Sequence, residues 1–208
     1  NVADVVNADS TVGDRLKVVF LPNYSVSAAE IIIPAADLSE QISTAGMEAS
    51  GTGNMKLAMN GALTIGTLDG ANIEIRDAVG EDNIFIFGLT AEEVAARRAH
   101  GYYPIELARS NAELAEVLRQ VRDGFFSPGD LRRFSPVIDA LLEDGEHFLC
   151  LADYEHYVDT QARVDDAYRD AVQWTRMAVI NTVSMGYFSS DRAIAEYAEG
   201  IWALEPIG

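Results

Sequence analysis

The sequence predicts an α/β fold in which part of a doubly wound, Rossmann-like parallel sheet is followed by a helical C-terminal region. Up to Gly88, short apolar runs bounded by proline or glycine alternate with stretches that favour helices, a pattern typical of parallel sheets. After Gly88 the apolar residues recur at helical spacing. We therefore expect one unit over residues 1–208, with an α/β part at 1–88 and a mainly helical part at 89–208.

The first expected strand is the apolar run LKVVFL, from Leu16 to Leu21, which Pro22 and Asn23 close. Such a run predicts a strand buried on both faces of a parallel sheet. Further strands are expected at residues 35–44, 63–67 and 84–87, with helices between them at 27–32, 54–60 and 71–79. Because the βα loops of such a sheet open at the carboxyl ends of its strands, we expect ligands at that edge.

The rest of the chain predicts helices that pack through apolar faces. They are expected at residues 90–101, 111–122, 136–143, 155–182 and 190–202, and Pro206 ends the last one. Aromatic residues such as Tyr157 and Tyr168 recur at helical spacing in the longest of them, which favours core packing over ligand stacking.

Composition excludes several classes of function. The 33 acidic and 15 basic residues give a net charge of −18, which repels nucleic acid and anionic membrane surfaces. No apolar run approaches the roughly 20 residues that cross a bilayer. Cys150 has no cysteine partner and no metal-ligand spacing around it, which predicts a buried apolar residue and no metal site. The lack of a signal pattern favours the cytoplasm, and a start at Asn1 within a helix end indicates a fragment.

The run EASGTGNMK, from Glu48 to Lys56, carries the clearest chemical signal. The small residues Ser50 to Gly53 allow successive backbone N–H groups to converge on a phosphate or carboxylate at the start of a helix. Lys56 then lies in the first turn of that helix, near the bound anion. The run follows the carboxyl end of an expected strand, so its position favours ligand binding.

Three interpretations of this lysine follow from the residues alone. Lys56 is a point charge on a phosphate, a Schiff-base lysine that carries an aldehyde cofactor such as pyridoxal phosphate, or a surface lysine after an ordinary helix cap. The phosphate loop of nucleotide hydrolases is disfavoured. Its glycine spacing is absent, and Leu57 stands where that loop needs a hydroxyl for Mg²⁺.

Longer motifs resemble one family. EASGTGNMKLAMNGALTIGTLDGANIEI, the preceding IPAADLSEQISTAG, the turn KVVFLPNY and the late MGYFSSDRAIAEYAEGIW together resemble the glycogen, starch and maltodextrin phosphorylases of bacterial type, from about Val2 to Pro206. The resemblance implies the later part of the second, cofactor-binding domain of a B-type glycosyltransferase fold. The first domain and the opening strands of the second are absent.

The resemblance also implies roles for individual residues. Lys56 is implied as the Schiff-base lysine for pyridoxal 5'-phosphate, with the backbones of Thr52 and Gly53 on the cofactor's phosphate and Tyr24 against the cofactor. The implied ligands of the glucosyl unit are Glu48, Ser50 and Gly51.

The implied reaction is the reversible phosphorolysis of terminal α-1,4-glucosidic bonds. Its partners are an α-1,4-glucan (glycogen, starch or maltodextrin), inorganic phosphate and glucose 1-phosphate. The remainder of the phosphorylase chain is also implied as a partner, and the intact enzyme is implied to be a homodimer. Because residues outside this chain complete the site, we expect the isolated chain to be inactive. We also expect its exposed sheet edge to promote self-association.

Two other functions compete with this one. The first is an α/β module that binds a phosphorylated ligand without covalent chemistry at the glycine-rich turn. The second is an autonomous interaction protein in which the site is vestigial.

Overall fold

The computed structural model describes residues 1–143 and 145–204. The chain divides into two compact groups of residues. The helical group comprises residues 1–29 and 92–155, and the sheet group comprises residues 30–91 and those from 156 onward. These boundaries differ from the expected division at residue 88, because the start of the chain groups with the helices and a late segment groups with the sheet. The expectation of a single packed unit stays a prediction.

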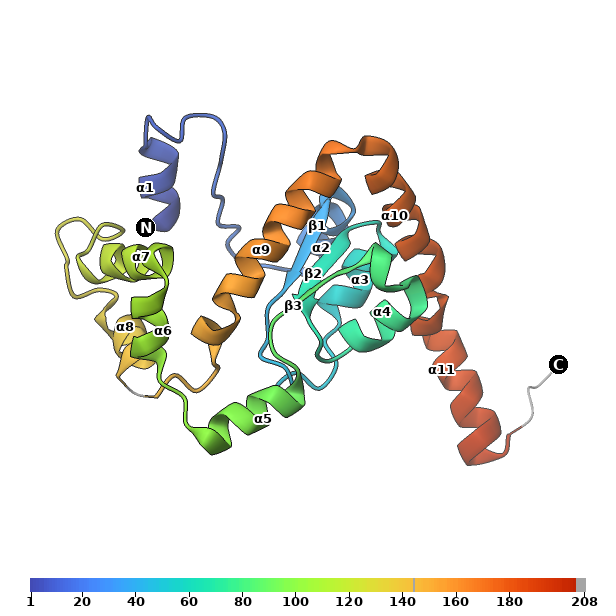
Figure 1. Ribbon diagram of the computed structural model, residues 1–208. Helices are drawn as coiled ribbons and strands as arrows, with labels where there is room; N and C mark the ends of the chain where they lie inside the picture. The colour runs from blue at the N-terminus through green and yellow to red at the C-terminus, as the bar shows by residue number, and fades with distance from the viewer. Residues whose placement is uncertain (144, 205–208) are drawn as a thin grey trace. The chain divides into compact units, whose positions relative to one another are not determined.

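The sheet group is built on three parallel strands in the order β1-β2-β3 (Figure 1). These are β1 (Leu38–Gln41), β2 (Leu63–Thr67) and β3 (Phe85–Phe87). Leu38 pairs with Leu63, and Ile65 pairs with Phe85. Every residue of β2 is buried, as its run of apolar and small residues predicts for a central parallel strand. The strand expected at 35–44 is shorter than predicted, because polar residues flank its centre.

Short helices lie before and between these strands. They are α2 (Val26–Ile32), η1 (Ile33–Ala35), α3 (Gly53–Met59), α4 (Asn72–Val79) and η2 (Glu81–Asn83). Ala58 of α3 and Ile75 of α4 are fully buried in one cluster with Ile84 and Met185. This cluster covers one side of the sheet, so α3 and α4 lie together on that side (Figure 1).

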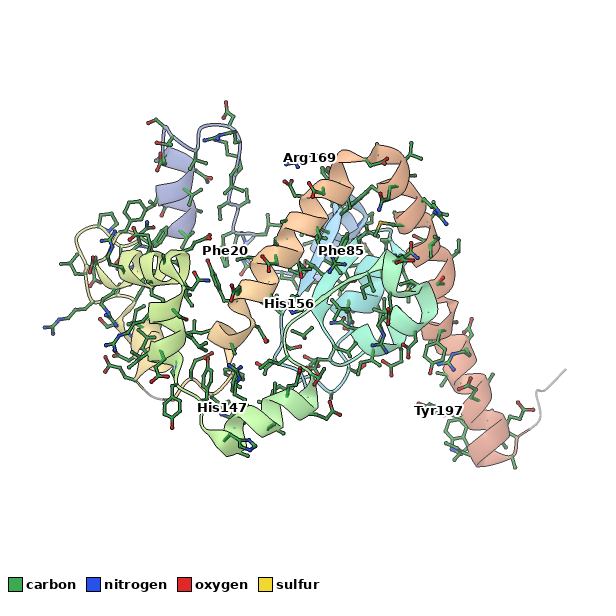
Figure 2. The ribbon with its side chains drawn as sticks, in the orientation of Figure 1. Phe20, Phe85, His147, His156, Arg169 and Tyr197 are labelled. Carbon is green, nitrogen blue, oxygen red and sulfur yellow. The ribbon has the colours of Figure 1, made fainter. Side chains whose placement is uncertain are left out.

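The other side of the sheet packs against the long helix α9 (Cys150–Arg169) and the start of α10 (Ala171–Ser184). Val164 and Trp174 belong to the same cluster as Leu63, Ile65, Phe85 and Phe87, and the rings of Phe85 and Trp174 stack with centroids 6.3 Å apart. The His156 ring, which Figure 2 labels on α9, accepts a 3.0 Å hydrogen bond from the Gly88 N–H. The sheet is therefore covered on both sides.

The helix expected over residues 155–182 is two helices. The Asp170 carboxylate accepts hydrogen bonds from the backbone N–H groups of Val172 and Gln173, which begins α10 and separates it from α9. The chain then continues through η3 (Met185–Phe188), α11 (Ser190–Tyr197) and the π-helix η4 (Ala198–Trp202). The expected stop at Pro206 lies outside the described residues.

The helical group packs around a separate core of leucine, isoleucine and alanine side chains. Its elements are α1 (Val2–Ala8), α5 (Ala91–His100), α6 (Pro104–Ser110), α7 (Ala112–Arg122), α8 (Ser135–Leu142) and the first turns of α9. Asn111 caps α7 by accepting a 3.0 Å hydrogen bond from the Leu114 N–H. The sequence did not predict α6, which begins at Pro104 in the first helical position.

The prediction of a buried strand at Leu16–Leu21 is wrong. The segment belongs to no strand, and Phe20 is 83% exposed (Figure 2). The backbone of Val18 instead pairs with the side-chain amide of Asn7, which donates to the Val18 carbonyl at 2.8 Å and accepts from its N–H at 2.9 Å. An apolar run forms a buried strand only where neighbouring strands supply a ladder, and none of the described strands pairs with this one.

The prediction that Cys150 is buried is also wrong, because the residue is exposed. Partial desolvation of its thiol and the nearby Glu146 carboxylate raise the pKa of Cys150 to about 11. The thiolate is therefore disfavoured at neutral pH, which argues against a nucleophile as the sequence does. No helix within the described part of the chain is both long and apolar enough to span a bilayer.

Candidate functional site

The run Glu48 to Lys56 lies at the carboxyl edge of the sheet. It belongs to the loop that leaves β1 after Gln41 and ends where α3 begins at Gly53. Thr52 is the N-cap residue of α3 but makes no side-chain capping hydrogen bond. The run thus follows the end of a parallel strand and opens a helix, as the sequence predicts.

Lys56 lies one turn beyond the helix cap. Its residue is exposed, and its ammonium group donates a 3.3 Å hydrogen bond to the hydroxyl of Thr52. The backbone N–H of Lys56 also donates to the Thr52 carbonyl at 3.1 Å. The amine is therefore held beside the glycine-rich turn and is open to a ligand.

The turn keeps backbone donors available. Within residues 1–143 and 145–204, no acceptor takes a hydrogen bond from the N–H groups of Gly51, Thr52 or Gly53. Gly51 has a φ of +81°, a conformation that side chains disfavour. A Cβ added at Gly53 would meet nothing closer than 4.0 Å, so the space beside its backbone is open. Free N–H donors next to an amine fit a phosphate that is attached to an aldehyde cofactor.

Polar side chains for a neutral ligand stand in the same loop. Glu48 and Ser50 are both exposed. One oxygen of the Glu48 carboxylate accepts a 3.4 Å hydrogen bond from the Ser50 N–H, and the Ser50 hydroxyl donates to the Gly51 carbonyl at 3.2 Å. A carboxylate beside a hydroxyl suits the hydroxyl groups of a sugar.

Three buried residues that the sequence analysis did not single out support this loop. Asp69, just beyond β2, accepts hydrogen bonds from the loop. The Asn54 amide donates to the Asn72 side-chain oxygen at 3.0 Å, and the Asn72 amide donates to the Thr67 carbonyl at 3.0 Å. The sequence signal for Asp69 and Asn72 was a polar cluster, LDGAN, directly after a strand, whereas Asn54 lies within the run EASGTGNMK itself.

Comparison with known proteins shows the family to which the chain belongs. The sequence model of the carbohydrate phosphorylases matches residues 1–204. The chain belongs to the carbohydrate phosphorylase family. Similar relatives include glycogen phosphorylases from Synechocystis sp. (58% identical over 207 residues) and Pasteurella multocida (54% over 207 residues), and the mouse brain form (52% over 206 residues).

These alignments cover 99% or more of this chain but only 24% or 25% of each relative. The phosphorylase chain described here therefore spans about a quarter of the length of the relatives that it matches. The family resemblance inferred from the glycine-rich run and its neighbours is confirmed.

Tyr24, the remaining predicted site residue of this phosphorylase chain, lies in the helical group. It follows Asn23, which has a φ of +53°, and is 70% exposed. Its contact with the cofactor stays a prediction.

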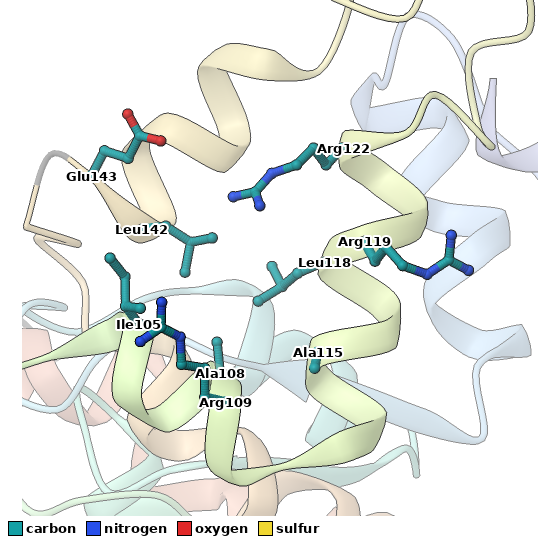
Figure 3. A pocket seen from close by; sticks show the side chains of 9 residues that line it. All are labelled: Ile105, Ala108, Arg109, Ala115, Leu118, Arg119, Arg122, Leu142 and Glu143. Atoms are coloured by element: carbon teal, nitrogen blue, oxygen red, sulfur yellow. The ribbon is translucent and has the colours of Figure 1, made fainter.

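A hollow of this chain lies within the helical group, between α6, α7 and α8 (Figure 3). It has a volume of about 260 Å³, and its lining includes Arg109, Arg119 and Arg122. Arg119 is already paired with Glu116 and Asp123 at 2.6 and 2.9 Å. No group of three or more potential metal ligands occurs in the described part of the chain.

Proposed function

We propose that this chain is part of an α-glucan phosphorylase that reversibly converts terminal α-1,4-glucosidic bonds and inorganic phosphate into glucose 1-phosphate. The observation that carries the proposal is the amine of Lys56 beside the N–H groups of Thr52 and Gly53, which have no acceptor among the described residues, in a chain of this family. The similar relatives are glycogen phosphorylases.

Pyridoxal 5'-phosphate fits the donor set of this site. Lys56 supplies the amine that attaches it, and the backbone N–H groups of Thr52 and Gly53 bind its phosphate. We also assign Tyr24 to the cofactor, as the resemblance to the family implies. The chemistry that the cofactor supplies here is a phosphate group that exchanges a proton with inorganic phosphate.

The protein groups around the cofactor bind and orient the glucosyl unit. The Glu48 carboxylate accepts hydrogen bonds from sugar hydroxyls, while the Ser50 hydroxyl and the Gly51 backbone add further polar contacts. The backbone N–H groups of Thr52 and Gly53 would hold the cofactor's phosphate, whose negative charge would favour the positive charge that develops on the sugar during cleavage. Positively charged groups that gather two phosphates come from the remainder of the chain.

The same proposal has consequences for the fold and for the intact protein. The three parallel strands are part of a doubly wound, Rossmann-like sheet, which the remainder of the phosphorylase chain extends. The intact protein is a cytoplasmic homodimer that acts on glycogen, starch or maltodextrin. The isolated 208-residue chain is inactive because catalytic groups that act as a unit lose nearly all activity when some are missing.

A phosphorolysis assay tests this proposal. A full-length chain that carries this segment is incubated with maltodextrin and inorganic phosphate, and glucose 1-phosphate is measured. We expect turnover by the full-length chain and none by the 208-residue chain. Turnover by the short chain would contradict the proposal that residues outside this chain complete the site. No turnover by either chain would contradict the proposed reaction.

The alternative is a module that binds a phosphorylated ligand at the same turn without a covalent bond. The 3.3 Å hydrogen bond from Lys56 to Thr52 is compatible with it, because a lysine that acts as a point charge needs the same position. The two functions differ in what Lys56 must do, and the substitutions described in the Discussion separate them.

A further inference from the structure

Asp69 connects the ends of two neighbouring strands. It follows β2 by two residues, is 4% exposed, and its carboxylate is shared among three donors from the loop after β1. One oxygen accepts from the Gly46 N–H at 2.8 Å, and the other accepts from the Glu48 N–H at 2.8 Å and from the Ser43 hydroxyl at 3.1 Å. A buried carboxylate with these partners fixes the path of the loop, because hydrogen bonds to a charged group are the stronger ones.

The residues after Asp69 touch the same loop again on the far side of Glu48. The Ala71 N–H donates a 2.7 Å hydrogen bond to the Ser50 carbonyl. A Cβ added at Gly70, which has a φ of +50°, would lie 2.5 Å from the Ser50 carbonyl oxygen and 3.0 Å from Cγ of Glu48. The backbone around Glu48 is therefore held from both sides by residues 69–71.

This arrangement divides the donors of the loop into two sets. The N–H groups of Gly46 and Glu48 are used by Asp69, whereas those of Gly51, Thr52 and Gly53 have no acceptor in the described residues. The N–H groups of Thr52 and Gly53 thus remain available to an anion beside Lys56. The Glu48 carboxylate lies earlier in the loop, where it accepts a 3.4 Å hydrogen bond from the Ser50 N–H and is exposed to a neutral ligand.

We propose that Asp69 is a positioning residue for substrate binding. It acts through the Glu48 backbone and orients the Glu48 carboxylate toward the glucosyl unit. This inference rests on the proposed function, since it assigns Glu48 to the sugar and the turn to a phosphate.

The substitution Asp69→Asn tests the proposal because it keeps the size of the side chain and removes one acceptor. An amide nitrogen cannot accept from the Gly46 or Glu48 N–H, so one of the two backbone hydrogen bonds must be lost. In a full-length chain that carries the substitution, we expect the KM for glucose 1-phosphate in glucan synthesis to rise about tenfold, which corresponds to about 1.4 kcal/mol of binding. The cofactor content at Lys56 is expected to stay equal to that of the unsubstituted chain.

Glu146→Gln is the matched control. Glu146 is also a buried carboxylate, 2% exposed, that accepts from two backbone N–H groups, those of Cys150 and Leu151, but it lies in the helical group. Its substitution is expected to lower the thermal midpoint and leave the KM unchanged. If Asp69 had only a structural role, both variants would lower the thermal midpoint and leave the KM unchanged.

The outcomes separate the inference from the function on which it rests. Absence of cofactor from the unsubstituted full-length chain would contradict the proposed function, independently of Asp69. An Asp69→Asn chain that folds and retains the cofactor with a KM within twofold of the original would overturn the inference. If Asp69→Asn does not fold, Ser43→Ala removes only the 3.1 Å hydroxyl contact, and a KM unchanged by that variant would overturn the inference too.

Discussion

A polar loop and an apolar run of this chain differ in how the rest of the structure holds them. The loop over residues 42–52 and the run at Leu16–Leu21 were both expected at the sheet. The loop is held there by Asp69, Asn54 and Asn72, whereas Phe20 in the run is 83% exposed. Buried side chains hold the loop, whereas the apolar run is paired at Val18 through the exposed side-chain amide of Asn7. A polar loop can thus be well defined while an apolar run is left exposed, because burial depends on the partner that is present.

The largest expected effect tests whether the loop is a site at all. In the full-length chain, Lys56→Ala is expected to lower the rate of phosphorolysis by at least about a thousandfold, because the proton exchange that the cofactor supplies is lost. Lys56→Arg keeps the positive charge but cannot attach an aldehyde, so it is expected to be equally inactive. Substantial activity of Lys56→Arg would favour the non-covalent module instead.

The next effect tests how tightly the loop is anchored. Gly70→Ala places a Cβ 2.5 Å from the Ser50 carbonyl oxygen at a φ of +50°, and we expect it to lower the free energy of unfolding by about 2–4 kcal/mol. Gly129→Ala is the control, since Gly129 has a φ of +89° but no atom within 4 Å of the added Cβ. Chemical denaturation that gives equal losses for the two variants would show that backbone strain alone, and no close approach of the loops, matters at Gly70.

A smaller effect tests the exposed run. In the isolated 208-residue chain, Phe20→Ser is expected to change the free energy of unfolding by less than about 0.5 kcal/mol, because the ring is 83% exposed. In the full-length chain the same substitution is expected to cost about 3 kcal/mol, since further strands can bury the run as the sequence predicts. Equal costs in the two chains, measured by urea denaturation, would mean that the run never joins a sheet.

The smallest effect concerns an exposed residue of the helical group. Exposure alone does not make Cys150 reactive, because desolvation of its thiol and the Glu146 carboxylate raise its pKa to about 11. A raised pKa lowers the thiolate fraction at every pH below it, so alkylation by iodoacetamide is expected to be slow at pH 8 and to increase up to about pH 11. A pH midpoint of alkylation near 8.5, the pKa of a free cysteine, would contradict the raised pKa of Cys150.

The sequence predicts most of the sheet and the place of the loop, because both depend on local patterns. The burial of β2 follows from LTIGT, and Lys56 follows from a glycine-rich turn before helix-forming residues. The role of Asp69 could not be predicted, because its partners lie 21 to 26 residues earlier in the chain and meet it only in the folded structure. The boundary at Asp170 was missed for another reason: apolar spacing continues across it, and only the cap contacts reveal the break.

The central claim is that Lys56 holds a cofactor beside the backbone donors of Thr52 and Gly53. The most direct measurement is borohydride reduction of the full-length chain, followed by peptide mass mapping, with Lys17 as the internal control. The account predicts a phosphopyridoxyl group on Lys56 and none on Lys17. An unmodified Lys56 in a chain that catalyses phosphorolysis would contradict it.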